Sequence, residues 1–258
     1  MTFSWTAPRR LPILIGHRGA SSVAPENTLA AFRRAITDGA DAIELDVRLT
    51  SDGEVVVIHD SRLERTTNGR GWVERTTLAD LQRLSAGAWF HRKFSGERIP
   101  TLAEVLRITR TRIGVNIEIK NRRSGRKRFD IVERTCAIVE DYGSLSTVLI
   151  SSFNHAHVKR VREIQPKILT GVLYHPVKHF RRSPSRLAAA AGAGAFICSK
   201  NVFRSRTAIG LASHRMLSGV YSINDARTLR RVLTGGANLI YSDRVADLRR
   251  LLDLDLNG

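Results

Sequence analysis

Histidine and carboxylate side chains recur at the ends of four short apolar runs in the first half of this chain. In chain order, these run ends carry His17-Arg18, Glu44-x-Asp46, His59-Asp60 and Glu118-x-Lys120. Side chains two residues apart on a strand point to the same face, so Glu44 and Asp46 can act together. If the runs are neighbouring strands of a parallel barrel, their ends meet at one rim, and the pattern predicts one site built from all four.

The chemistry of this predicted site follows from its residue types. Three carboxylates without cysteine form an oxygen-only donor set, which suits one divalent cation, Mg²⁺ or Ca²⁺, rather than zinc. Two histidines can supply the acid and the base of one displacement, and cationic side chains beside them can bind phosphate oxygens. The sequence therefore predicts a metal-assisted phosphoester site. The metal ligands would be Glu44, Asp46 and Glu118, and the acid–base pair would be His17 and His59. The phosphate contacts would come from Arg18 and Lys120.

Each of these residues has a plainer explanation when it is taken alone. A histidine at a strand end is more often structural than catalytic, and a single strand-end glutamate is more often ion-paired or on the surface. Lys120 could simply pair with Glu118, and Arg18 with Asp60. The occurrence of complementary groups at four successive strand ends favours a common site over these separate explanations.

The rest of the chain alternates between strand-like and helix-like patterns, as parallel α/β folds do. Apolar residues at helical spacing predict a helix over 28–38, with Gly39 at its end. Eight or nine strands in all favour an α/β fold of the TIM type, a (β/α)8 barrel, over an open doubly wound sheet. After residue 100 the predicted strands are 115–119, 147–151, 169–173, 195–198, 219–223 and 239–241.

The pairing of the second and third predicted strands, 42–49 and 54–58, can be predicted in two ways. Asp52-Gly53 between them is a strong hairpin signal, which would make the two strands antiparallel. We instead expect a parallel pair without a crossover helix. An antiparallel partner would carry His59 to the end of the sheet opposite Asp46, whereas the chemistry requires the two side chains together.

A polar, turn-rich stretch over residues 61–99 separates the third predicted strand from the regular part of the chain. It predicts a small inserted subdomain beside the site. Thr101-Leu102-Ala103-Glu104 then forms a capping box that would open a helix. No repeat or low-complexity linker divides the sequence, so we expect a single barrel domain over residues 1–258, with 61–99 inserted within it.

The composition predicts a globular and strongly basic protein. Of the 258 residues 42% are hydrophobic, enough for a substantial core, and the net charge of +18 predicts attraction to phosphates or other polyanions. Cys136 and Cys198 show no metal-site spacing, and we expect reduced core thiols in a cytoplasmic protein. Residues 1–12 do not resemble a signal peptide, and no apolar stretch reaches the length of a membrane span.

Three basic runs, 120–128, 178–186 and 204–206, follow predicted strands and would therefore lie at the mouth of the site. A generally arginine-rich, solvated surface is one explanation. The other is a positive collar that steers anionic substrates or associates weakly with an anionic membrane surface. We expect no specific nucleic-acid partner, and the sequence leaves the oligomeric state open.

The ordered motifs resemble the glycerophosphodiester phosphodiesterase family. The resemblance runs from about residue 13 to 243 and implies a barrel hydrolase that cleaves glycerophosphodiesters into glycerol 3-phosphate and an alcohol. The principal matching segments are His17-Arg18-Gly19-Ala20, Pro25-Glu26-Asn27-Thr28, Glu44-Leu45-Asp46-Val47, Thr50-x-Asp52-Gly53, Val57-Ile58-His59-Asp60, Asn116-Ile117-Glu118-Ile119-Lys120 and Ser151-Ser152-Phe153-Asn154.

The resemblance also implies roles for individual residues. It assigns the divalent metal to the same three carboxylates, acid–base catalysis to the two histidines, and phosphate contacts to the arginine and the lysine. Glu26 would support the metal or bind a substrate hydroxyl, and Asn27 would support the site from behind. The chain departs from the family's usual Trp-Thr-Val-Asn segment, because Tyr221 stands in place of the tryptophan. We expect Tyr221 to form an aromatic wall that affects the preference for the leaving alcohol.

Two other functions are open at this point. A lysophospholipase D-like lipid phosphodiesterase would use the same groups but would need an apolar channel at the mouth of the site. The other alternative, from a different class, is a basic protein that binds nucleic acid or membrane on an inactive barrel. The intact histidines and carboxylates argue against the second alternative.

Overall fold

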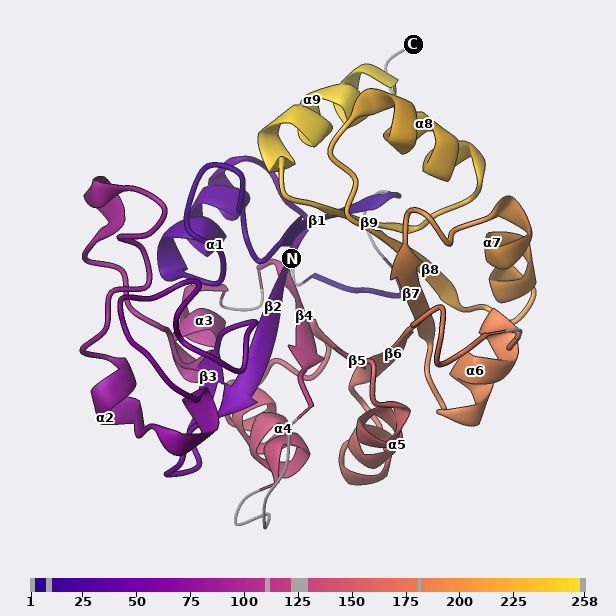
Figure 1. The fold of residues 1–258 in the computed structure, drawn as a ribbon. Helices are drawn as coiled ribbons and strands as arrows, with labels where there is room; N and C mark the ends of the chain where they lie inside the picture. Colours follow the sequence, from indigo (N-terminus) through magenta and orange to yellow (C-terminus); the bar gives the residue numbers. More distant parts are fainter. Residues whose placement is uncertain (1–2, 8–10, 110–111, 122–129, 181, 256–258) are drawn as a thin grey trace.

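Parallel strands close into a barrel in the computed structural model, and helices surround it (Figure 1). The structure describes residues 3–7, 11–109, 112–121, 130–180 and 182–255. Within these residues, eight parallel strands follow one another around the barrel, which β1 and β2 close, so the predicted TIM-type fold is confirmed. In barrel order they are β1 (Ile13–His17), β9 (Leu239–Ser242), β8 (Leu217–Tyr221), β7 (Ala195–Ser199), β6 (Leu169–Leu173), β5 (Val148–Ser152), β4 (Gly114–Ile119) and β2 (Ala42–Leu49).

Four of the outer helices begin at residues whose side chains cap them. Thr28, Asp130, Asn154 and Asp225 each accept a hydrogen bond from a backbone N–H in the first turn that follows, which satisfies a donor without a helical partner. Each outer helix before α9 returns the chain so that the next barrel strand runs parallel, and all of these strands therefore end at one rim. The outer helices are α1 (Leu29–Thr37), α3 (Leu102–Thr109), α4 (Ile131–Asp141), α5 (His155–Ile164), α6 (Pro184–Ala190), α7 (Ser205–Ala212), α8 (Ala226–Thr234) and α9 (Val245–Asp255).

The amino-terminal end of the barrel is closed by an aromatic side chain that precedes β1. Trp5 is buried inside the barrel cluster, and its indole N–H donates to the backbone oxygen of Thr147 at 2.8 Å. Phe3 packs against its ring edge-on. Among the residues that the structure describes, the polar side chains of the barrel interior therefore face the carboxyl end of the strands, where (β/α) barrels carry their sites.

The predicted parallel pairing of the second and third strands is wrong. β3 (Val55–Val57) pairs with β2 in antiparallel register, Val47 opposite Val57, as the Asp52-Gly53 hairpin signal indicates. β3 is thus an extra strand outside the barrel. The argument for a parallel pair failed because β2 extends beyond the barrel rim: the hairpin turns above the site and brings the chain back to the level of Asp46, where the backbone N–H of Ile58 donates to its carbonyl oxygen.

The chain between β3 and α3 forms an irregular layer with its own small apolar cluster, which includes Leu63, Val73 and Leu81. Its short elements are the 3₁₀ turns Val73–Arg75 and Arg92–Phe94 and the helix α2 (Leu78–Leu81). Figure 1 shows this layer beside β3, at one side of the barrel. The capping box predicted at its end is present, since the backbone N–H of Thr101 donates to Glu104 and the reverse bond is also made.

Two other expectations can be compared with the described residues. Cys136 and Cys198 are free and buried, as expected. Within the described part of the chain, no helix has the length and apolar character needed to cross a membrane. Of the predicted basic runs, residues 122–128 and 181 lie outside the described residues.

Candidate active site

The two predicted catalytic histidines converge along one edge of β2. His17 ends β1, opposite Glu44 of β2, while the antiparallel strand β3 continues along β2 from Leu49 down to Val47. Both strands lie on the edge of β2 that faces away from β4, because β4 pairs with the other edge from Ala42 to Val47. β1 and β3 therefore approach each other end to end, and the chain ends that meet carry His17 and His59.

The predicted metal ligands form a compact carboxylate cluster. Oxygen atoms of Glu44, Asp46 and Glu118 lie within 4.8 Å of one another, and all three side chains are buried. Burial, together with the negative charge of Asp46, raises the pKa of Glu44 to about 8. Such crowding of like charges is relieved by a cation, and an all-oxygen donor set fits Mg²⁺ or Ca²⁺. The residues present therefore fit the predicted divalent metal.

The predicted phosphate-binding cations also contact the carboxylate cluster. Lys120 Nζ lies 2.8 Å from Asp46 Oδ1 and 2.5 Å from Glu118 Oε1, so the ion pair considered as a plain explanation exists inside the site. Arg18 does not pair with Asp60; its Nη1 donates to Glu26 at 2.8 Å, and its Nε lies 3.4 Å from Asp46. Burial opposes the charge of Asp46, but Lys120 and Arg18 lower its pKa well below the usual range.

Glu26 and Asn27 lie behind this arrangement and hold parts of it in place. Glu26 accepts hydrogen bonds from both Arg18 and Arg65. Asn27 donates its Nδ2–H to Asp46 Oδ2 at 2.8 Å, and its Oδ1 accepts the Asp46 backbone N–H at 3.3 Å. Together with His59 they line a smaller cavity beside the site. Their geometry is that of groups that orient an arginine and a carboxylate.

Each histidine is held by a carboxylate at Nδ1. His17 Nδ1 lies 2.7 Å from Asp243 Oδ1, and His59 Nδ1 lies 2.6 Å from Asp60 Oδ1. A carboxylate can only accept at this contact, so the proton of each neutral ring is held on Nδ1 and Nε2 is left to face the site. Both Nε2 atoms are then available for proton transfer.

The two histidines differ in charge environment. Burial lowers the pKa of His17, but the Asp243 hydrogen bond and the charge of Glu44 outweigh it, and the net shift is upward. Burial also acts on His59, where the charges of Lys120 and Arg18 add to it, and the pKa of His59 is lowered. In the metal-free protein, His17 is thus the more readily protonated of the two.

The sequence prediction missed the carboxylate that holds His17. Asp243 follows β9, its Oδ2 accepts from Asn224 at 2.6 Å, and its Oδ1 accepts from Ser21 at 3.1 Å. The signal was present, because Asp243 stands two residues after the predicted strand 239–241, close to its end as the other site groups are to theirs. Arg65, which donates to both Asp60 and Glu26, had no such signal, because it lies in the irregular layer.

The site opens into a cavity of about 210 Å³. Its polar side includes the two histidines, Arg18 and Lys120, whereas Phe153, Leu173, Ile197 and Tyr221 line the other side. Tyr221 at the end of β8 therefore borders the cavity, as expected. A ligand with one polar face and one apolar face can be accommodated here.

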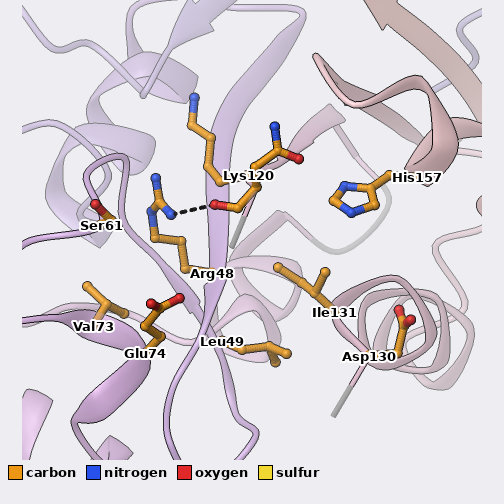
Figure 2. A pocket seen from close by; sticks show the side chains of 10 residues that line it. Arg48, Leu49, Ser61, Val73, Glu74, Lys120, Asp130, Ile131 and His157 are labelled. Carbon is orange, nitrogen blue, oxygen red and sulfur yellow. Dashed lines mark hydrogen bonds between the residues drawn. The ribbon is translucent and has the colours of Figure 1, made fainter. Parts of the chain in front are cut away.

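A second cavity lies near the carboxyl end of β2, between the irregular layer and α4. Figure 2 shows Arg48, Lys120 and His157 around it. The guanidinium of Arg48 donates twice to the backbone oxygen of His59, at 2.9 and 2.8 Å, and once to that of Asn121 at 3.2 Å. Arg48 thus links the segment that follows β3 to the segment that follows β4.

Comparisons with known proteins agree with this arrangement. The model of the glycerophosphoryl diester phosphodiesterase family matches residues 17–247. A glycerophosphodiester phosphodiesterase of Caldanaerobacter subterraneus subsp. tengcongensis is 48% identical over 164 residues, 63% of this chain and 66% of that protein. One from Bacillus subtilis is 31% identical over 255 residues, 92% of this chain and 85% of that protein.

This chain also resembles a phosphodiesterase whose structure was solved with its product bound. The Oleispira antarctica phosphodiesterase, determined in complex with the product sn-glycerol-3-phosphate, superimposes with a TM-score of 0.83 at 27% identity and covers 94% of this chain and 97% of its own. The matched segment includes every strand of the barrel from the end of β1 to β9. The chain belongs to the glycerophosphoryl diester phosphodiesterase family.

Proposed function

We propose that this protein hydrolyses glycerophosphodiesters to glycerol 3-phosphate and an alcohol. The observation that carries the proposal is the convergence of two carboxylate-held histidines on a cluster of three buried carboxylates and two cations, in one cavity. The product complex of the Oleispira antarctica relative supports the substrate class. The family match supports the same reaction.

We further propose that Glu44, Asp46 and Glu118 hold one divalent cation, Mg²⁺ or Ca²⁺. When bound, the cation would supply positive charge that polarises a phosphate oxygen and lowers the pKa of a neighbouring hydroxyl. Asn27 would keep Asp46 in its orientation through the two hydrogen bonds between them. Lys120 would then shift from its carboxylate partners toward the phosphate.

The chain's own residues account for the proton transfers. Nε2 of one histidine accepts the proton of the glycerol 2-hydroxyl as that oxygen attacks phosphorus. Nε2 of the other donates a proton to the oxygen of the departing alcohol, which leaves a cyclic phosphate. Water then opens the cyclic phosphate with the two roles exchanged, so both histidines return to their starting states. Arg18 and Lys120 bind the phosphate oxygens throughout.

The test is release of glycerol 3-phosphate from glycerophosphocholine and glycerophosphoethanolamine, with Mg²⁺, with Ca²⁺ and with a chelator. We expect release that depends on the cation and that returns when the cation is restored after chelation. Lysophosphatidylcholine serves as the matched lipid substrate. Turnover of the lipid alone would favour the lysophospholipase D-like alternative, and release in the presence of chelator would contradict the metal proposal.

We also propose weak association with anionic membrane surfaces through the loop between β6 and α6. Val177 and Phe180 expose 80% and 70% of their surface, and Lys178 and Arg182 lie beside them at the rim where the site opens. Apolar side chains next to cations are suited to the boundary of an anionic bilayer. Cosedimentation with anionic vesicles should exceed that with neutral vesicles at low salt; equal binding would contradict the proposal.

A further inference from the structure

The backbone of His59 is held by an arginine side chain of the neighbouring strand. Nε and Nη2 of Arg48 on β2 both donate to the backbone oxygen of His59, at 2.9 and 2.8 Å. Nη1 of the same guanidinium donates to the backbone oxygen of Asn121 at 3.2 Å. Hydrogen bonds from a charged donor are stronger than those between neutral groups. One planar group therefore fixes the segment that follows β3 relative to the segment that follows β4.

This contact lies beyond the end of strand β3. β3 ends at Val57, and the backbone N–H of Ile58 still donates to a carbonyl oxygen of β2. His59 is the next residue, on the way to the irregular layer. Arg48 stands opposite Val56 in the register of the hairpin, and its side chain reaches along the hairpin as far as His59. The side chain thus extends the attachment to β2 to the residue that carries the imidazole.

Arg48 also lies next to the active site. It lines the second cavity together with Lys120, which lines the active-site cavity as well (Figure 2). Burial lowers the pKa of Arg48, and the charge of Asp46, two residues earlier on β2, opposes this shift. An arginine keeps its proton at neutral pH, so the guanidinium offers all of its N–H groups as donors.

The oxygen that Arg48 holds belongs to the peptide group between His59 and Asp60. The atoms of a peptide group lie in one plane that includes the Cα atoms of both residues. Fixing this oxygen therefore restricts both members of the pair, whose side chains meet at 2.6 Å. His17 is fixed differently, because it ends a barrel strand and pairs with Glu44 in the strand ladder.

We infer that Arg48 is a positioning residue for the acid–base chemistry. It holds the peptide group between His59 and Asp60 so that Nε2 of His59 faces the reacting atoms. The inference rests on the proposed function. A displacement of a catalytic group by about 1 Å can cost about 10²-fold in rate, so loss of this contact should lower turnover much more than ligand binding.

The experiment compares Arg48→Met, which removes every donor, with Arg48→Lys, which keeps the charge but lacks the fixed fork of donors. Arg48→Met should lower kcat for glycerophosphocholine about 10- to 100-fold, and Arg48→Lys should lower it less. Calorimetry with Ca²⁺ or Mg²⁺ should show a change of less than about twofold in the affinity for sn-glycerol 3-phosphate. The control is Arg162→Met on α5. Arg162 also donates to a backbone oxygen, that of Pro166, and its substitution should leave kcat unchanged.

Two further measurements separate positioning from a general loss of structure. In a double-mutant cycle, Arg48→Met should lower kcat by less than about twofold in the His59→Ala background, because the group that it positions is absent there. In NMR spectra of the metal-free protein, Arg48→Met should shift or broaden the Nδ1 proton signal of His59 and leave that of His17 in place. Neither result is expected of a side chain that only stabilises the fold.

Each outcome decides the inference. Near-native kcat in Arg48→Met, an equal loss of kcat in the His59→Ala background, or an unchanged His59 signal overturns it. Circular dichroism verifies folding, and Arg48→Lys undergoes the same measurements, so the inference is tested even where the methionine variant does not fold. The proposed function is judged separately by the wild type. A wild type that releases no glycerol 3-phosphate from a diester would contradict the proposed reaction, whereas the NMR comparison would still show whether Arg48 positions His59.

Discussion

His17 and His59 each contact a carboxylate through Nδ1 at a similar distance, but different parts of the fold hold the two residues. His17 is the last residue of a barrel strand, and its Asp243 partner stands at the end of the adjacent barrel strand. His59 follows a short strand outside the barrel, and its partner is the next residue, Asp60. Asp60 in turn depends on Arg65 of the irregular layer, which donates to it at 2.6 Å.

The difference shows that similar orientation does not require similar surroundings. His17 gains a raised pKa from a carboxylate network inside the barrel, whereas His59 keeps a lowered pKa in a more open position among cations. The barrel thus fixes one histidine as part of the fold. The hairpin and the layer beside it place the other, so His59 should be more sensitive to changes outside the barrel.

The largest effect is expected from removing either imidazole. His17→Ala and His59→Ala should each lower kcat for glycerophosphocholine by about 10²- to 10⁴-fold or more, because each removes one of the two groups proposed to transfer protons. Steady-state kinetics measure the loss, and circular dichroism should show an unchanged fold. A variant with near-native turnover would remove that histidine from the acid–base pair.

Substitution of the two carboxylate partners should lower kcat by different amounts. Asp243→Asn should lower kcat more than Asp60→Asn, by tens of fold against a few fold. Asp243 also accepts from Asn224 and Ser21, so its substitution disturbs a connected network. Parallel kinetics on both variants test this order. Equal losses would mean that the barrel network adds nothing to the orientation of the ring.

The difference in pKa between His17 and His59 can be measured in the metal-free protein by NMR titration of the imidazole signals. His17 should titrate above 6.5 and His59 below it. Because the Asp243 hydrogen bond raises the pKa of His17, Asp243→Asn should lower that pKa. Asp60→Asn should lower the pKa of His59 in the same way. An unchanged pKa of His17 in Asp243→Asn would contradict its assigned cause.

The smallest effect tests the hairpin that carries His59. Gly53 at the hairpin turn has φ +90° and Gly143, between α4 and β5, has φ +62°. Alanine at either position should cost about 1–2 kcal/mol in the free energy of unfolding, because both need left-handed backbone. Only Gly53→Ala should also lower kcat, by a few fold. Denaturant unfolding and kinetics on both variants distinguish the hairpin from a matched glycine elsewhere.

Much of this architecture could be predicted from the sequence because it depends on local periodicity. Alternating apolar patterns indicated the barrel, and the strand-end rule placed Glu44, Asp46 and Glu118 together. The same rule, applied to the last predicted strand, would also have found Asp243. The hairpin signal of Asp52-Gly53 was correct and was set aside only because the extension of β2 beyond the barrel rim could not be foreseen.

By itself, the sequence determined which residue types could do chemistry and on which strands they lie, since strand period and turn chemistry are local properties. Tertiary structure decided how His59 reaches the site and which cation pairs with which carboxylate. These facts depend on strand register and on contacts between residues far apart in the chain. A local sequence pattern contains no information on strand register or on long-range contacts, because only the closed barrel brings β1, β4 and β9 around one interior.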